Sequence, residues 1–303
     1  MYAKRLKEFI HRYPFIKAAI KAALYPAIVV RKSFNNKKSF WQKEILNNLG
    51  DIIIGNPVIR VDEFEGVFTV SPHSHLFYRL ILSKCYEPKL VKLCMKYLDK
   101  NRDAIDVGAN IGFYSVLFAK NLANKKVLSI EPTKNAIQFL RQNIKLNDVT
   151  DKVVVFEGVA SDKKGVDEIK TIKGKEEYSS LGKMIHPCIE KEKWSLEEVI
   201  SNTLDNLVQE KSLDPGFLKV DTEGVEHLVF KGAQNVLSEK RPIILSELSD
   251  FLLKGNGSSA EEVIDLIKSN GYDLFDPMNP SVQPNGKNSD NIICFPKEMG
   301  IRL

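Results

Sequence analysis

The sequence of 303 residues lacks the features that mark several classes of protein. Its four cysteines show no C-x-x-C pairing, and with the five histidines they form no metal-ligand spacing. The longest apolar run near the N-terminus, at 22–30, is interrupted by Pro26 and is far shorter than the ~20 residues of a membrane-spanning helix. No convincing signal-peptide cleavage site follows it. We therefore expect a cytoplasmic protein whose cysteines are reduced and mostly buried.

The positive charge of the chain is concentrated at its N-terminal end. The net charge is +5, but residues 1–50 hold eleven Lys and Arg against Glu8 and Glu44, a net charge of +9, so the remainder carries −4. Apolar residues recur at near-helical spacing among these basic residues. We expect a basic helical arm over 1–50. It either lies on an anionic membrane surface, at the inner face of the membrane, or covers the catalytic domain or a dimer interface.

The stretch 104–131 predicts a strand, a glycine-containing turn, a helix and a second strand that ends in a carboxylate. In an open α/β sheet, a ligand sits just beyond the carboxyl ends of the strands. Gly108 and Gly112 let the backbone approach a ligand without a clashing Cβ atom. Glu131 stands where such folds place the acid that accepts hydrogen bonds from a ribose. The stretch therefore predicts a nucleoside pocket.

The nucleoside is not expected to be a dinucleotide. The turn lacks the G-x-G-x-x-G pattern, in which a pyrophosphate rests on the helix N-terminus. Asp106 at the strand end would repel a pyrophosphate but suits a cationic ligand with an amino group. S-adenosylmethionine carries both a sulfonium and an ammonium, and it is the cofactor that we predict.

The rest of the chain predicts a doubly wound α/β sheet with an antiparallel edge strand. Strand and hairpin signals at 51–71 indicate a small β cap, and strands alternate with helices from residue 101 onwards. We expect a helix at 233–237 and an irregular loop at 162–193, which we interpret as a lid that holds part of the acceptor site. The predicted division is 1–50 for the arm, 51–100 for the cap region and 101–303 for the cofactor-binding domain.

Several motifs, taken in order, resemble the FkbM-type methyltransferases. They are D-V-G-A-N-I-G at 106–112, E-P at 131–132, T-L-D at 203–205, K-V-D-T-E-G-V-E at 219–226, K-G-A at 231–233, and P-I-I at 242–244 ahead of Glu247, with Y-E-P at 86–88 before the first strand. The resemblance covers about residues 70 to 250. It implies a class I S-adenosylmethionine-dependent methyltransferase that acts on oxygen, often on a sugar or polyketide hydroxyl.

The resemblance also implies roles for particular residues. The loop at the methionine end of the cofactor would be formed by Asp106, Gly108, Asn110 and Gly112. Glu131 would hold the ribose, and Asp221 would close the pocket near the sulfonium. From the residues themselves, Glu157 and Gly158 follow the next predicted strand, at 153–156, where they would flank the adenine ring.

Methylation of a hydroxyl needs a base within hydrogen-bond reach of the leaving proton. The candidates are Asp221, Glu223, Glu226 and Glu247 at the ligand edge of the sheet, together with the neighbouring His227. A divalent cation held by the carboxylates would serve instead by lowering the hydroxyl pKa, although no metal-ligand spacing identifies a site. Glu223 and Glu226 also have a purely structural interpretation, because acidic residues stabilise the N-terminus of a following helix.

Two other classes of protein stay open. A nicotinamide-dependent oxidoreductase would share the strand, the turn and Glu131 but lacks the glycine triplet. A membrane-associated binding protein with a degenerate nucleoside pocket would explain the basic arm but not the complete set of carboxylates. We expect a hydroxyl-bearing small molecule or glycan as substrate, no nucleic-acid partner, and a peripheral contact with anionic membrane.

Overall fold

The computed structural model describes residues 55–172, 179–182, 193–287 and 290–301. The chain divides into two compact units, Met1–Tyr86 and Glu87–Leu303. The predicted basic arm at 1–50 lies outside the described residues, as does the first strand signal of the predicted cap at 52–54. The predicted three-part division of the chain stays a prediction.

The described part of the first unit is a hairpin followed by a helix. Strands β1 (Val58–Val61) and β2 (Gly66–Thr69) pair in antiparallel register, as the turn residues between them predict. Helix α4 (His75–Ser83) begins at Ser74, whose hydroxyl accepts a hydrogen bond from the Phe77 amide at 3.1 Å. Phe77, Leu80 and Ile81 are buried along one face of α4.

The second unit is built on a seven-stranded sheet with the order β11-β12-β10-β9-β3-β4-β5. Its strands are β3 (Asp103–Val107), β4 (Val127–Glu131), β5 (Val153–Glu157), β9 (Pro215–Val220), β10 (Ile243–Glu247), β11 (Tyr272–Phe275) and β12 (Asn291–Pro296). The five strands from β10 to β5 are parallel, and β12 runs antiparallel to both β10 and β11. The predicted doubly wound sheet with an antiparallel strand near its edge is confirmed.

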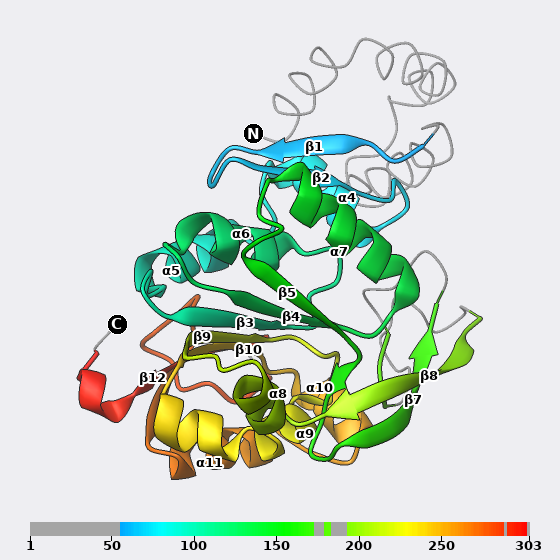
Figure 1. Ribbon diagram of the computed structural model, residues 1–303. Helices are drawn as coiled ribbons and strands as arrows, with labels where there is room; N and C mark the ends of the chain where they lie inside the picture. Colours follow the sequence, from blue (N-terminus) through cyan, green and yellow to red (C-terminus); the bar gives the residue numbers. More distant parts are fainter. Residues whose placement is uncertain (1–54, 173–178, 183–192, 288–289, 302–303) are drawn as a thin grey trace, which may run out of the picture. The chain divides into compact units, whose positions relative to one another are not determined.

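Helices cover both faces of this sheet (Figure 1). On one face lie α5 (Pro88–Tyr97), α6 (Phe113–Asn121) and α7 (Lys134–Leu146), and on the other lie α8 (Leu204–Glu210), α9 (Glu226–Lys231), α10 (Asp250–Gly255) and α11 (Ala260–Ser269). A short 3-10 helix, Lys297–Met299, follows β12. The central strands are buried on both faces, which explains why they are almost continuously apolar. The polar exceptions among their residues therefore need a specific explanation.

A second sheet corrects the prediction of an irregular loop at 162–193. Strand β7 (Gly165–Thr171) lies within that range and pairs antiparallel with β8 (Ser195–Asn202), and β8 pairs with the short β6 (Val159–Ala160). The alternation of β7 is hidden in the sequence, because its exposed face carries Val166 beside charged residues. The β7–β8 pair extends away from the main sheet (Figure 1).

The predicted helix at 233–237 is present but lies at 234–240, and its second part is of the π type. Helix α9 ends at Lys231, and a five-residue π-helix, Val236–Lys240, begins after a break. The Asp205 carboxylate accepts hydrogen bonds from the Asn235 and Val236 amides, at 3.0 and 2.9 Å, and so starts the second element. Gly232 lies at the break, where a Cβ atom would come within 2.0 Å of the Ser161 carbonyl oxygen.

The described residues show no helix long and apolar enough to cross a membrane. Cys85, Cys94 and Cys294 are buried, as expected, and form no disulfide in the described part of the chain; Cys188 lies outside it. Burial raises the pKa of the Cys94 and Cys294 thiols, so these side chains behave as apolar core groups.

Candidate active site

The strand order places a topological switch point between β3 and β9. From β3 the chain continues to β4 and β5 on one side, whereas β9 and β10 lie on the other side. Open α/β sheets bind their ligands in the crevice beyond the strand ends at such a point. The turns that follow β3 and β9 carry most of the predicted site residues.

Gly108 joins these two turns. Its φ angle is +73°, and a Cβ atom at this position would lie 1.9 Å from the Asp221 carbonyl oxygen. The Asp221 amide donates a hydrogen bond to the Val107 carbonyl at 3.1 Å, which continues the β3–β9 pairing into the turn. Only glycine fits both the backbone conformation and this close approach.

Glu131 fixes the turn after β3. The Asn110 amide donates to Oε2 of Glu131 at 2.8 Å, and the Thr133 amide and hydroxyl donate to Oε1 at 3.0 and 2.6 Å. Burial raises the pKa of Glu131, although these hydrogen bonds favour its charged form. Each carboxylate oxygen has two lone pairs, so Oε2 keeps one acceptor position after its bond with Asn110. Glu131 can therefore still accept a hydrogen bond from a ribose hydroxyl.

The remainder of this turn is anchored to α7. Asn110 and Gly112 both have positive φ angles, +49° and +86°, and a Cβ atom on Gly112 would lie 2.5 Å from Cδ1 of Leu140. The buried Asn143 side chain donates to the Ile111 carbonyl at 2.9 Å. The turn is thus held in its conformation by the protein alone, before any ligand binds.

Asp106 is fully buried rather than open at the strand end. Ser115 on α6 donates to Oδ2 of Asp106 at 2.6 Å, and Ser129 on β4 donates to Ser115 at 2.7 Å. Burial raises the pKa of Asp106, whereas the charge of Lys219 and the hydrogen bond from Ser115 lower it. Within the described residues, Oδ1 of Asp106 accepts no hydrogen bond. This oxygen instead lies 3.6 Å from Nζ of Lys219, with which Asp106 forms an ion pair.

The two residues predicted beside the adenine ring differ from each other. Glu157 is half-exposed and pairs with Arg141, whose Nη2 lies 2.5 Å from Oε1 of Glu157. Gly158 is buried; its amide donates to the Glu131 carbonyl at 3.1 Å, and a Cβ atom there would lie 2.3 Å from the Ile200 carbonyl oxygen. Gly158 thus joins Glu131 on β4 to the second sheet. A cofactor contact for Glu157 or Gly158 stays a prediction.

In the turn after β9, Glu226 has a structural role that differs from the helix stabilisation we considered, because it lies in the first turn of α9 and holds the turn before that helix. Its Oε1 accepts hydrogen bonds from the Thr222 amide and hydroxyl, both at 2.9 Å, and from the Gly224 amide at 3.2 Å. Burial raises the pKa of Glu226. Glu223 adopts a left-handed conformation with φ +55°, and its carbonyl accepts from the Ser180 hydroxyl at 3.3 Å. This contact brings Ser180, which also pairs with Lys170 of β7, to the predicted catalytic turn.

Glu247 ends β10 next to this turn. Its Oε2 is buried and, within the described part of the chain, accepts no hydrogen bond. Burial raises the pKa of Glu247 well above its ordinary value, and the charges of Asp221, Glu223 and Glu226 raise it further. The structure therefore brings Glu247 close to Asp221 and Glu223. This is the arrangement expected when neighbouring parallel strands end at the same edge of the sheet.

His227 belongs to a different environment. The charged groups that act on it are Lys231, Glu262 and Asp162, which lie on α9, on α11 and after β6. Burial and Lys231 lower the pKa of His227, and the two acids oppose them. The structure thus places His227 with these residues rather than with Glu247, and its predicted catalytic role gains no support from the geometry.

The sequence interpretation assigned no role to Lys219 and Tyr114. Lys219 lies on β9 with its side chain 7% exposed, and its Nζ lies 3.3 Å from Asp221 Oδ2 and 3.6 Å from Asp106 Oδ1. The Tyr114 ring lies 5.2 Å from this Nζ, and its hydroxyl donates to Glu87 at 2.8 Å. A lysine inside an otherwise apolar parallel strand is the signal that identifies Lys219, because lysine is almost never buried without a partner.

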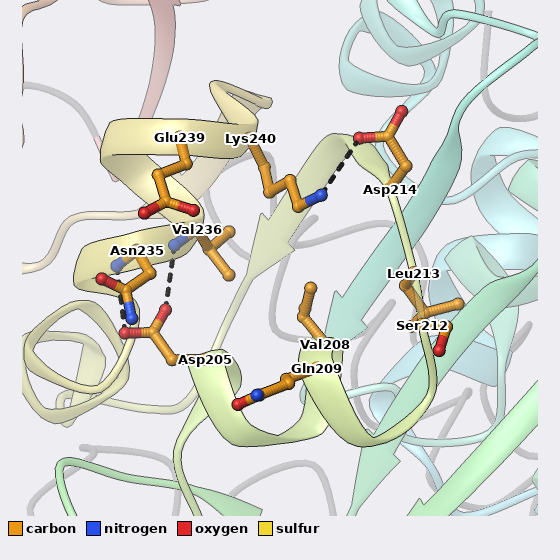
Figure 2. Close-up of a pocket in the computed structure, with 10 residues that line it drawn as sticks. All are labelled: Asp205, Val208, Gln209, Ser212, Leu213, Asp214, Asn235, Val236, Glu239 and Lys240. Atoms are coloured by element: carbon orange, nitrogen blue, oxygen red, sulfur yellow. Dashed lines mark hydrogen bonds and ion pairs between the residues drawn. The ribbon is translucent and has the colours of Figure 1, made fainter.

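A cavity of about 550 Å³ lies elsewhere, between α8, the π-helix and the residues that precede β9. Figure 2 shows Asp205 bonded to the start of the π-helix and Lys240 paired with Asp214 at 3.8 Å. Asp214 comes just before β9, so the cavity is at the amino end of that strand, opposite the predicted site. Asp205, part of the T-L-D motif, therefore serves the fold rather than the chemistry.

The carboxylates at the strand ends do not form a recognisable metal centre. Among the described residues, no group of three or more His, Cys, Asp or Glu side chains is arranged to hold a metal ion. The possibility of a divalent cation stays a hypothesis for experiment.

The chain is similar to known methyltransferases in sequence and in fold. The family model described as the methyltransferase FkbM domain matches residues 106–274. A search of curated proteins found no match. Methyltransferase FkbM from Methylobacillus flagellatus KT is 16% identical with a TM-score of 0.43, over 72% of this chain and 52% of that one. This chain therefore spans about half the length of the Methylobacillus protein.

Two further solved structures are similar at a comparable level. Precorrin-6y C5,15-methyltransferase from Geobacter metallireducens GS-15 is 13% identical with a TM-score of 0.38, over 69% of this chain and 85% of that one. TYW2 from M. jannaschii, in complex with AdoMet, is 12% identical with a TM-score of 0.39, over 80% and 85% of the two chains.

The strand order and the glycine-containing turn after β3 define a Rossmann-like α/β fold of the methyltransferase type. The family match covers more than half of the chain. The chain belongs to the FkbM methyltransferase family, a class that depends on S-adenosylmethionine. This assignment favours our first interpretation over the nicotinamide-dependent oxidoreductase.

Proposed function

We propose that the protein is an O-methyltransferase that acts on a hydroxyl of a sugar, a cell-surface glycan or a related polyhydroxyl natural product. The observation that carries the proposal is Glu247, whose buried and unbonded Oε2 lies beside Asp221 and Glu223 at the strand ends. A hydroxyl donates a hydrogen bond and gives up a proton when it is methylated, so it fits a site with a carboxylate that lacks a donor.

The residues at the carboxyl ends of β3, β4 and β9 fit S-adenosylmethionine. Glu131 keeps an acceptor position for the ribose, Gly108 leaves the turn without a side chain, and Asp221 adds negative charge that suits a cation. When bound, this cofactor supplies an electrophilic methyl group on a positively charged sulfur. Methyl transfer is an in-line displacement, so the main task of the protein is to position the acceptor.

In this proposal Glu247 accepts the proton of the acceptor hydroxyl. Its raised pKa brings the carboxyl group closer to the pH of the cell, which makes it a stronger base than an ordinary glutamate. Asp221 and Glu223 then orient the acceptor by accepting hydrogen bonds from its other hydroxyl groups. An acceptor with a phosphate or carboxylate next to the reacting hydroxyl would be repelled by these three acids.

The test uses S-adenosylmethionine labelled in its methyl group, the full-length protein and fractions of neutral glycans, anionic glycans, polyketides and lipids. We expect label in neutral, hydroxyl-rich acceptors as a methyl ether, identified by NMR. Glu247→Gln should lower the rate by about 10²- to 10⁴-fold, whereas Glu239→Gln, an exposed carboxylate away from the strand ends, should not change it. Methylation on nitrogen or carbon, or full activity of Glu247→Gln, would show that the proposal is wrong.

The basic N-terminal arm supports a second, independent proposal about location. We propose that the protein is cytoplasmic and that residues 1–50, with a net charge of +9, bring it to the inner face of an anionic membrane. Glycans carried on lipids would be accessible there. The alternative, an arm that holds a dimer together, would appear as a smaller mass in light scattering after truncation.

A further inference from the structure

Lys219 is a buried cation directly behind the crevice. Besides its ion pairs with Asp221 and Asp106, its Nζ donates a hydrogen bond to the Gly108 carbonyl at 3.3 Å. Lys219 and Asp106 are direct neighbours in the register of β9 and β3, and Asp221 follows Lys219 by two residues. The three side chains therefore lie on the same face of the sheet.

These three groups differ in their access to a ligand. The Asp221 side chain is 32% exposed, whereas Lys219 and Asp106 are 7% and 0% exposed. A ligand in the crevice therefore meets Asp221, and Lys219 stands behind it. Within the described residues, Lys219 is the only cation that forms an ion pair with either carboxylate, so one ammonium is shared by two acids.

The neighbours of Lys219 stabilise its charged form. Burial alone would lower its pKa, but Asp221, Asp106 and Glu87 outweigh burial and raise the pKa above its ordinary value. Tyr114 holds Glu87 through its hydroxyl and places its ring near the ammonium group. The site thus carries a built-in positive charge before the cofactor brings its own.

We propose that Lys219 is a positioning residue that sets the preference of the site for S-adenosylmethionine over S-adenosylhomocysteine. The inference rests on the cofactor class assigned above. The two ligands differ by one methyl group and by the positive charge on sulfur, which is lost in the reaction. Because Lys219 neutralises part of the charge of Asp221, it reduces the advantage that the charged sulfur of the cofactor has over the uncharged sulfur of the product.

Removing the charge of Lys219 should therefore strengthen the binding of S-adenosylmethionine relative to that of S-adenosylhomocysteine. A unit charge that acts over about 8 Å, at an effective dielectric constant of about 20 to 40, changes the binding of another unit charge by about five- to thirtyfold. Substitution of Lys219 should change the ratio of the dissociation constants of product and cofactor by roughly tenfold. A merely structural role would weaken both ligands alike and would leave the ratio unchanged.

The experiment measures the dissociation constants of both ligands by calorimetry on the full chain, without acceptor. Lys219→Met should raise the product-to-cofactor ratio about tenfold, and Lys219→Arg, which keeps the charge, should stay close to the native ratio. Lys152→Met is the matched control, because Lys152 bonds only the Ala119 and Leu122 carbonyls in the described structure, at 3.0 and 2.7 Å, and should leave the ratio unchanged.

Asp221→Asn provides a second variant if Lys219→Met does not fold. It removes the outer carboxylate and should lower the same ratio, the opposite direction to Lys219→Met. An unchanged ratio in Asp221→Asn, or equal weakening of both ligands in Lys219→Met, would overturn the role of Lys219. Since no acceptor is present, a failure to methylate hydroxyls would leave this measurement intact. Failure of the native chain to bind either ligand would instead overturn the cofactor assignment.

Discussion

Replacement of Glu247 by glutamine should make the protein more stable and less active. The Oε2 atom of Glu247 is buried without a hydrogen-bond donor in the described structure, and the neighbouring acids repel its charge. A buried polar group without a partner costs about 1–3 kcal/mol. Glutamine has nearly the same shape, is neutral and has an NH₂ group that can donate to Asp221 or Glu223.

The pH dependence separates this explanation from a general packing effect. The pKa of Glu247 is raised in the folded chain above its ordinary value of 4.5, so the folded state binds this proton more tightly than the unfolded chain. The contribution of this group to stability is complete below that value and is lost as the pH rises through the raised pKa. The advantage of Glu247→Gln should therefore be small near pH 5 and should grow towards pH 8.

Thermal unfolding across this pH range provides the assay. A change of 1 kcal/mol shifts the melting temperature of a domain of this size by about 2–4 °C, so the gain is measurable near pH 8. Glu239→Gln, an exposed control, should change stability by less than about 0.5 kcal/mol. A melting temperature of Glu247→Gln below that of the native chain at pH 8 would refute the reasoning.

Three further predictions test other parts of the molecule. Gly108→Ala should unfold at a clearly lower temperature than Gly257→Ala, because both have positive φ angles but only the alanine at 108 meets a carbonyl oxygen. In calorimetry, Glu131→Ala should bind S-adenosylhomocysteine about 1–3 kcal/mol more weakly, and the native chain should not bind NAD; unchanged affinity would contradict the ribose assignment. Deletion of residues 1–38 should abolish sedimentation with anionic liposomes, and added salt should weaken that of the full chain; equal sedimentation of both would exclude the membrane contact.

Much of the fold could be predicted because its strands are buried on both faces. Runs such as Ile243–Leu245 are apolar without interruption, and the turns between elements carry glycine or proline. The β7–β8 pair was not predicted because Val166 and Ile200, which lie opposite each other, are both exposed. Apolar residues on the exposed face break the alternation of apolar and polar residues that is typical of a half-buried strand.

The site was predictable as a set of strand ends but not as a set of contacts. Glu226 and Glu223 belong to one sequence motif but differ in the folded chain. The Glu226 carboxylate accepts hydrogen bonds from backbone amides of the preceding turn, whereas Glu223 adopts a left-handed backbone conformation. The ion pair of Lys219 with Asp106 joins two residues that are distant in sequence and adjacent only in the sheet register. Local sequence patterns contain neither piece of information.

The contact between Gly108 and the Asp221 carbonyl has a consequence for how this protein can diversify. Because the turns after β3 and β9 touch without room for a side chain, neither can change its length or course unless the other changes with it. Evolution of a new acceptor preference is easier outside these two turns. The described residues 179–182, which reach Glu223 through Ser180, lie outside both turns. Libraries aimed at new acceptors should therefore vary that segment and keep both turns as they are.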